Sequence, residues 1–383
     1  MKLYRIILII CLSAFFSNIF ISCSNDAESE DDGKSPASSR SIIALYPPRS
    51  LGDNSYYDDI SYTLHLCAIK NNAAIADIVS GDLSEAEENL KEVLESKTGG
   101  DTLILCADSL YLPFLEKYEQ SAFEERQILV IGSREVENSA ISTAFFPDYG
   151  VNMLAGVAAR SLSPFGKETK CLCLLANDKN TQLLDGLKGF VQGFGASWNE
   201  KIYDLLDLLF DIEAVEEYIK TASLMAVVFD YNEEEGAYSG INHQVMGYGY
   251  TSLMQDSKEN YGFNFYYPLY GTSTRGIGNY IKESKGSSFL FAGMNDNRSV
   301  SSEYIPFYVV KHIDKVVSLC VSQWISDKKI PHYQEFGLAA GYTELVINED
   351  NGGWNIEQLK NAVAEAKETA IQKEREYEDE QTQ

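Results

Sequence analysis

The stretch from residue 145 to residue 194, FFPDYGVNMLAGVAARSLSPFGKETKCLCLLANDKNTQLLDGLKGFVQGF, constrains the fold more than any other part of the chain. It predicts a helix of small residues over Asn152–Leu162, a strand over Lys170–Ala176 and a second helix that begins near Asn180. The strand is so apolar that neither of its faces can be left in water. The stretch therefore predicts one helix–strand–helix unit of a parallel sheet.

Strand and helix patterns alternate along the rest of the chain. Before the unit, the sequence predicts strands over Ser41–Tyr46, Asn72–Ile78, Thr102–Ala107 and Ile128–Gly132, and helices from near Asp58, over Asp82–Ser96 with a Ser84–Glu87 capping box, and around Leu112–Phe123. After it, strands are predicted over Leu224–Phe229, Phe263–Leu269, Phe289–Met294 and near Phe336–Ala340, and helices over Asn279–Glu283, Tyr304–Ile325 and Trp354–Glu376, with the last ten residues frayed. This alternation is typical of an α/β fold in which helices cover both faces of a parallel sheet.

Ligands of such folds bind outside the carboxyl ends of the strands, where the loops converge. The loops to consider are Arg49–Asp58, Ala107–Leu112 and Phe145–Asn152. They point to a binding site at one edge of the sheet.

Composition limits the partners of the chain. Its 383 residues are 45% hydrophobic, which is enough for one large core or two medium ones. The 31 basic and 57 acidic residues leave a net charge of −26. Such a surface repels phosphate backbones, so we do not expect nucleic acid as a partner.

The first residues are typical of a bacterial lipoprotein signal. Lys2 and Arg5 precede the apolar run Ile6–Phe16, and Phe20–Cys23 matches a processing site. Residues 1–22 are then the signal peptide, Cys23 carries the lipid, and residues 23–40 form a flexible tether. An uncleaved helical anchor is the alternative. The acidic start of the tether is compatible with a surface-export signal and with a plain spacer.

No pattern in the chain indicates catalysis, a metal or a cofactor. The five cysteines after Cys23 are odd in number and irregularly spaced, which does not indicate a disulfide framework. Cys171 and Cys173 point to one side of a strand and are expected to be buried as small hydrophobic residues. The glycine-rich loop Gly271–Gly278 is compatible with an anion site or with a tight turn. Hydrolase and zinc-protease motifs are absent from the sequence.

An aromatic pair in the first of the three loops is the strongest local indication of a ligand. Tyr56 and Tyr57 could stack on a flat ring, and Asp58 and Asn295–Asp296 could accept hydrogen bonds from hydroxyl groups. The chain has 24 tyrosines, so packing is an equally good explanation from the residues alone.

Five segments, in this order, resemble the basic membrane protein family of ABC-transporter solute receptors, which includes purine-nucleoside-binding lipoproteins: GDNSYYDDISYTL, FPDYGVNMLAGVAARSLSPFGK, LKGFVQGF, FNFYYPLYGTSTRGIG and AGMNDNRSVSSEYIPFYVVKHIDKVV. The resemblance implies a type I periplasmic-binding fold, with two doubly wound parallel-sheet lobes joined by three crossovers. The first lobe is expected to comprise residues 41–146 and about 296–328, and the second residues 147–295 and about 329–383.

The resemblance also implies roles for single residues. Tyr56 takes the place of the aromatic that stacks on the base, Asp58 that of an acid, and Lys311 that of the lysine that meets the base. Tyr57 stands where the family has Asn, and Asn295 where it has an acid, with Asp296 beside it. An Asn in place of an Asp turns one acceptor into a donor.

Together these considerations predict eight ligand-binding residues: Tyr56, Tyr57, Asp58, Asp108, Phe146, Asn295, Asp296 and Lys311. The predicted function is that of a monomeric, lipid-anchored receptor of the cell envelope, outside the cytoplasm. It would bind a nucleoside-like small molecule without cofactor or metal and deliver it to an ABC permease. The alternatives are an orphan surface or sensor lipoprotein and an enzyme that acts on nucleosides.

Overall fold

The structure is a computed structural model of the full chain. It describes residues 40–48, 50–52, 56–96, 101–123, 126–162, 168–175, 181–196, 203–204, 223–228, 262–269, 290–291, 293–294, 304–326, 329–350 and 354–381. The predicted signal peptide, Cys23, the tether before residue 40, the Gly271–Gly278 loop, the Asn279–Glu283 helix, Asn295 and Asp296 lie outside these residues.

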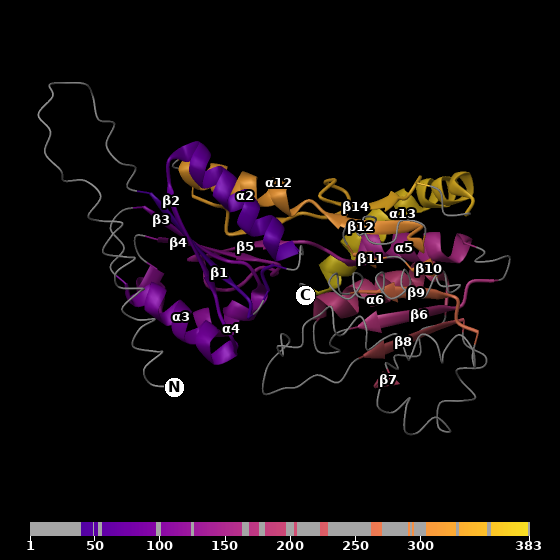
Figure 1. Ribbon diagram of the computed structural model, residues 1–383, viewed down its shortest axis with the longest axis horizontal. Helices are drawn as coiled ribbons and strands as arrows, with labels where there is room; N and C mark the ends of the chain where they lie inside the picture. The colour runs from indigo at the N-terminus through magenta and orange to yellow at the C-terminus, as the bar shows by residue number, and fades with distance from the viewer. Residues whose placement is uncertain are drawn as a thin grey trace, which may run out of the picture. The chain divides into compact units, whose positions relative to one another are not determined.

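The first lobe is built on a six-stranded parallel sheet (Figure 1). In spatial order the strands are β13 (Tyr333–Glu335), β5 (Ile141–Phe145), β4 (Arg126–Ile131), β3 (Thr102–Cys106), β1 (Ser41–Tyr46) and β2 (Ala74–Val79). Each is in parallel register with its neighbours. The carboxyl ends of β1, β3, β4 and β5 therefore lie along one edge.

Helices cover both faces of this sheet. Those on one face are α2 (Tyr56–Asn71) and α12 (Ile313–Ile325), and those on the other are α3 (Leu83–Glu95), α4 (Leu112–Leu115) and the short turns η1 (Ser109–Tyr111) and η2 (Gln120–Phe123). Alternate residues of one strand serve the two cores: Ala44 packs with α2 and α12, and Leu45 packs with α3. This period of two is why the central strands of the sheet, such as β1 and β3, are mainly apolar on both faces.

The second lobe contains a parallel sheet with the order β10 (Leu290–Phe291), β9 (Phe265–Pro268), β6 (Cys171–Leu175), β8 (Leu224–Val228) and β7 (Tyr203–Asp204). Beside it lies a small mixed sheet of β11 (Gly293–Met294), β12 (Phe307–Lys311) and β14 (Thr343–Ile347). Three helices belong to this lobe: α5 (Tyr149–Ser161), α6 (Thr181–Phe194) and α13 (Ile356–Gln381). Cys171 and Cys173 are buried in the core between sheet and helices, as predicted.

Helices α5 and α6 approach each other closely through glycines. A Cβ atom on Gly193 would lie 1.9 Å from the carbonyl oxygen of Met153, and one on Gly189 would lie 2.1 Å from that of Tyr149. Contacts this short leave room for hydrogen alone. Gly189 and Gly193 are therefore explained by backbone-to-backbone packing of the two helices.

Three crossovers connect the lobes. The chain passes from β5 to α5, from β12 to α12, and from β13 to β14. The last two differ from the expected bounds, because β12 pairs with β14 and packs in the second lobe, whereas β13 pairs with β5 of the first sheet. β13 is a three-residue edge strand of mostly polar residues, and its sequence signal is weak.

Several local predictions were wrong. The box at the start of α3 is formed by Asp82, whose side chain accepts from Glu85 N, and by Glu85, whose carboxylate accepts from Gly81 N; it does not involve Ser84 and Glu87. Strands β5 and β14 were not predicted. Residues 307–311 are a strand and not the start of a helix, so Lys311 ends a strand.

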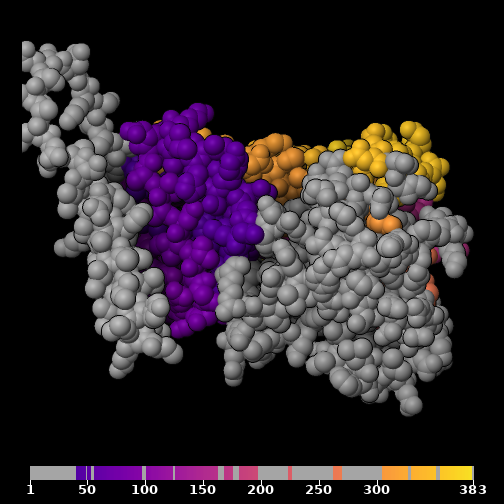
Figure 2. Space-filling view, in the orientation of Figure 1, coloured from indigo at the N-terminus to yellow at the C-terminus, as the bar shows by residue number. Residues whose placement is uncertain are grey.

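The C-terminal helix is also longer than predicted. α13 continues to Gln381, and Glu374 and Glu378 near its end are buried. Its outer side chains are exposed and form the yellow surface in Figure 2. No helix within the described ranges is long and apolar enough to cross a bilayer.

Candidate functional site

An aromatic cluster lies at the carboxyl edge of the first sheet. Tyr56 opens α2, and its ring meets that of Tyr57 edge-on, with 5.4 Å between centroids, and that of Phe146 at 6.4 Å. Phe146, directly after β5, packs in turn on Phe336 at 5.9 Å. Tyr57 and Phe146 are buried, whereas Tyr56 is half-buried. Tyr56 is therefore the ring of this cluster that can present a face to a ligand.

Two predicted acids shape the loops around these rings. Asp108, after β3, accepts from Leu110 N at 2.8 Å and caps η1, and its other oxygen accepts from Tyr57 Oη at 2.8 Å. Asp58 accepts from Gly52 N at 2.8 Å and so closes the loop that precedes α2. Both carboxylates position the aromatic cluster and bring negative charge to it.

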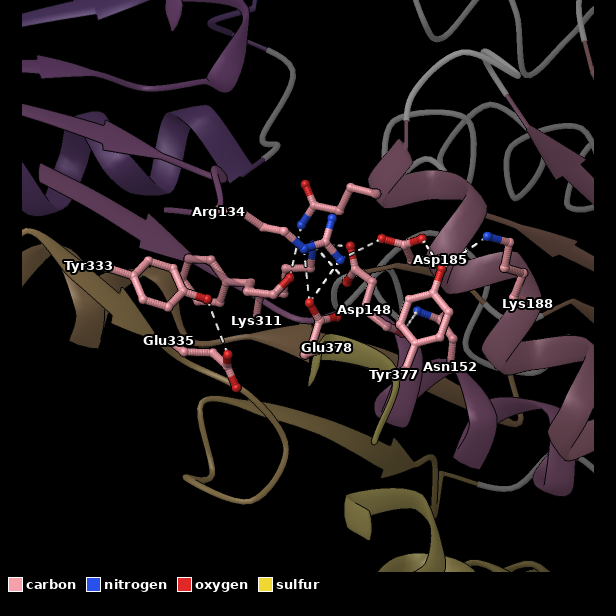
Figure 3. Close-up of polar contacts among 12 residues, drawn as sticks. Arg134, Asp148, Asn152, Asp185, Lys188, Lys311, Tyr333, Glu335, Tyr377 and Glu378 are labelled. Carbon is pink, nitrogen blue, oxygen red and sulfur yellow. Dashed lines mark hydrogen bonds and ion pairs between the residues drawn. The ribbon is translucent and has the colours of Figure 1, made fainter. Parts of the chain in front are cut away.

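Lys311 forms a buried ion pair with Asp148. The lysine ends β12 and the aspartate precedes α5, and Lys311 Nζ lies 2.8 Å from both carboxylate oxygens (Figure 3). Asp148 is 4% exposed. Burial raises the pKa of Asp148, and the nearby Lys311 ammonium opposes that rise. The pair ties the first crossover to the second.

Asp148 was not predicted as a site residue. It lies within Phe145–Asn152, one of the three loops selected at strand ends, but an acid in so acidic a chain is not distinctive by itself. Its role as the partner of Lys311 follows only from the structure, in which Lys311 ends strand β12 beside it.

The acids influence the hydroxyl of Tyr56. Burial raises the pKa of Tyr56 well above its usual value, and the negative charges of Asp108 and Asp148 raise it further. The phenol consequently stays protonated and can donate a hydrogen bond. The surrounding potential is negative and favours a ligand that offers hydrogen-bond donors.

Polar residues of the second lobe complete this neighbourhood. Gln182, at the start of α6, donates to the carbonyl of Phe146 at 3.0 Å. Asn152 donates to the carbonyl of Asp148 at 2.6 Å and accepts from Tyr267 Oη at 2.6 Å. The first crossover is therefore held by side chains of α5 and α6, and the sequence analysis did not select Gln182, Asn152 or Tyr267.

A second ion-pair network lies near the first (Figure 3). Arg134, in the loop after β4, donates from Nε to Glu378 Oε2 at 2.9 Å and from Nη2 to Asp185 Oδ2 at 2.8 Å. Tyr377 donates to the other oxygen of Asp185. This network was not predicted either, because α13 was expected to fray.

Within the described ranges, no three His, Cys, Asp or Glu side chains are grouped so that they could hold a metal ion. The five cysteines in these ranges are free thiols. Among the described residues, the candidate site thus consists of one aromatic face, Tyr56, beside the carboxylates of Asp58, Asp108 and Asp148 and the ammonium group of Lys311.

Neither protein-family models nor curated proteins match the sequence. Solved structures do. An ABC transporter solute-binding protein from Aeropyrum pernix K1 has a TM-score of 0.59 at 16% identity, with 88% of this chain and 89% of that one covered. A transcriptional activator of the comK gene from Bacillus halodurans has a TM-score of 0.57 at 15% identity, with coverage of 86% and 98%. GanP, a glucose-galactose binding protein from Geobacillus stearothermophilus, has a TM-score of 0.53 at 12% identity, with 82% of this chain and 98% of that one covered.

These similarities, together with two parallel-sheet lobes and three crossovers, define a type I periplasmic-binding-protein fold. The predicted fold class is confirmed. At these identities the fold is what the neighbours share with this chain, and the ligand has to be argued from the site.

Proposed function

We propose that this protein is a solute-binding protein of an ABC importer, located outside the cytoplasm, that closes its two lobes on a small polar ligand containing a ring. A nucleoside is the ligand we favour. The observation that carries the proposal is the half-buried ring of Tyr56 beside Asp108 and Asp148, at the carboxyl edge of the first sheet.

The chemistry of the site supports a neutral ligand rich in hydroxyl groups. An aromatic face packs on a flat ring, and carboxylates accept from hydroxyls. Asp58, Asp108 and Asp148 outnumber Lys311, so a phosphorylated ligand would be repelled. The neighbour named as a glucose-galactose binding protein gives independent support for a polar ring with hydroxyl groups.

The remaining parts of the proposal rest on the sequence. Cys23 would carry the lipid, the acidic segment after it would tether a monomeric body to the membrane, and an ABC permease would receive the ligand. Asn295 and Asp296, which follow β11 in the chain, remain proposed ligand contacts.

A sensor without a transporter is the second candidate function. The similarity to the comK activator covers 98% of that chain, so the same two-lobed architecture occurs in a protein named for regulation. In this version, the ligand-bound form would contact another protein and not a permease.

The direct test is ligand identification followed by a matched pair of variants. Mass spectrometry of freshly purified, denatured protein identifies a retained compound, and thermal shifts with nucleosides and neutral sugars rank candidates. Tyr56→Ala should weaken binding of the best compound by about 1–3 kcal/mol, roughly 5- to 150-fold, because it removes the stacking face.

Tyr62→Ala is the control, because Tyr62 lies on the same helix and is 68% exposed. Equal affinities for Tyr56→Ala and wild type would refute the site. Conversion of the compound to product would favour an enzyme.

A further inference from the structure

Arg134 is the side chain through which the first lobe reaches two acids of the second. It follows β4, and its guanidinium carbon lies 4.6 Å from the centroid of the Phe145 ring, at the end of β5. Stacking on this ring fixes the direction of the arginine. Its side chain is 24% exposed, so solvent screens the ion pairs only in part.

Both acids belong to the second lobe and are buried. Asp185 lies on α6 and is 4% exposed, and Glu378 lies near the end of α13 and is 7% exposed. One turn before Glu378, the buried Glu374 anchors α13. Its carboxylate accepts hydrogen bonds from Gly150 N at 3.1 Å and from Leu338 N at 2.9 Å. Because α13 is attached to α5 in this way, Glu378 moves together with the second lobe.

A buried carboxylate is costly without a cation beside it. Arg134 Nη2 lies 2.8 Å from Asp185 Oδ2 and 2.8 Å from Glu378 Oε2. The first lobe thus supplies a positive charge to two carboxylates of the second lobe. The pKa of Arg134 is raised by these two acids against the effect of burial, so the guanidinium stays charged. An ion pair of this kind exists only while the two lobes are in contact.

We propose that Arg134, Asp185 and Glu378 form a clasp that holds the lobes together, with Arg134 as a positioning residue for lobe closure. The C-terminal helix is then part of the closing mechanism, because its end supplies one of the two acids. The value of the clasp for ligand capture rests on the proposed function, but the clasp itself consists only of side chains of this chain.

The experiment measures the distance between the lobes without ligand. Spin labels on unnatural amino acids at Glu88 of α3 and Glu368 of α13, both exposed, avoid the native thiols. Pulsed electron paramagnetic resonance then gives the distance distribution. Arg134→Ala and Asp185→Asn should each move it to longer and broader distances, and Arg134→Lys should restore part of the short-distance population.

The control is Lys373→Ala. It breaks the half-buried pair of Lys373 with Glu376, 2.6 Å apart on the same helix and internal to the second lobe, and should leave the distribution unchanged. Melting curves identify any variant that fails to fold. If Arg134→Ala does not fold, Asp185→Asn and Arg134→Lys still test the clasp.

Unchanged distributions in Arg134→Ala and Asp185→Asn would overturn the clasp. A clasp confirmed in a chain that binds no nucleoside or sugar would instead count against the proposed ligand alone. The two proposals can therefore fail separately.

Discussion

At the scale of single residues, the site depends on charges that are balanced by very few partners. Asp148 is buried, and Lys311 is the ammonium group that meets it. Asp108 is instead satisfied by a backbone amide and a phenol. The first arrangement is sensitive to the loss of its cation, whereas the second spreads its charge over several neutral donors.

Lys311→Met should destabilise the fold by about 3–5 kcal/mol, because it leaves a buried carboxylate without a cation. The pKa of Asp148 is already raised by burial and would rise further. A raised pKa in the folded state means that stability is present at low pH and lost as pH increases. Urea unfolding should therefore show a larger loss at pH 8 than at pH 5.

The double variant Lys311→Met with Asp148→Asn should recover part of the stability, because the uncompensated charge is gone. No recovery, together with no pH dependence, would mean that the pair contributes through packing and not through charge.

The residues of the site were predictable to different degrees. Tyr56, Tyr57, Asp108 and Phe146 could be found because they lie just after apolar strands or at the start of a helix, and the structure brings them together. Arg134, Asp185 and Glu378 could not be found, since their contact joins three distant segments and no local pattern records it. Lys311 was selected by resemblance, and its partner emerged only from the strand pairing.

At the scale of elements, the close packing of α5 and α6 reverses the usual effect of a Gly→Ala substitution in a helix. Gly→Ala inside a helix usually stabilises it by about 1 kcal/mol. At Gly193 the new methyl group would lie 1.9 Å from the Met153 carbonyl oxygen, so the helices would have to separate. Gly193→Ala should destabilise by about 1–3 kcal/mol in thermal or urea unfolding.

Gly186→Ala in the same helix is the comparison. Its nearest neighbour would be the amide nitrogen of Asn152 at 3.0 Å, the end of a side chain. A smaller loss is expected there. Equal losses at the two glycines would show that backbone contact is not the cause.

Long periodic helices were predicted reliably, whereas their ends were not. The acidic tail of α13 lacks a regular apolar stripe, and fraying was the natural expectation. The helix continues because Glu374 accepts two backbone N–H groups and because Tyr149 and Tyr377 stack with 4.3 Å between ring centroids. Such tertiary contacts override a weak helix-end signal.

The same glutamate predicts a pH dependence. Burial raises the pKa of Glu374 from 4.5 to about 8. Its contribution to stability is complete below pH 4.5 and is lost as pH rises through about 8. One such group changes the free energy of unfolding by about 1.4 kcal/mol per pH unit within that window.

Glu374→Gln should flatten the profile of unfolding free energy between pH 5 and pH 8 relative to wild type, because the titrating group is gone. Parallel profiles for the two proteins would contradict the raised pKa. Glu365→Gln, at an exposed position of the same helix, is the control and should leave the slope unchanged.

At the scale of the whole molecule, the alternation of strands and helices was sufficient to predict a parallel sheet with helices on both faces. The division into two lobes came from the family resemblance, and neither source indicated which strand belongs to which lobe. β12 and β13 were exchanged between lobes in the prediction, because both are short and lie near crossovers. Sheet membership is decided by pairing between distant residues, such as Tyr333 with Thr143. A single sequence contains little information about such partners.

The position of β13 has a consequence for synthesis in the cell. The first sheet receives its outermost strand from residues 333–335, after every other strand of the described chain except β14 has been synthesised. While the ribosome is still at work, the edge formed by β5 has no neighbour on that side and can pair with foreign strands. Neither half can be excised as an independent fragment by a single cut, and nascent chains that stop short of residue 333 should be the ones that chaperones retain.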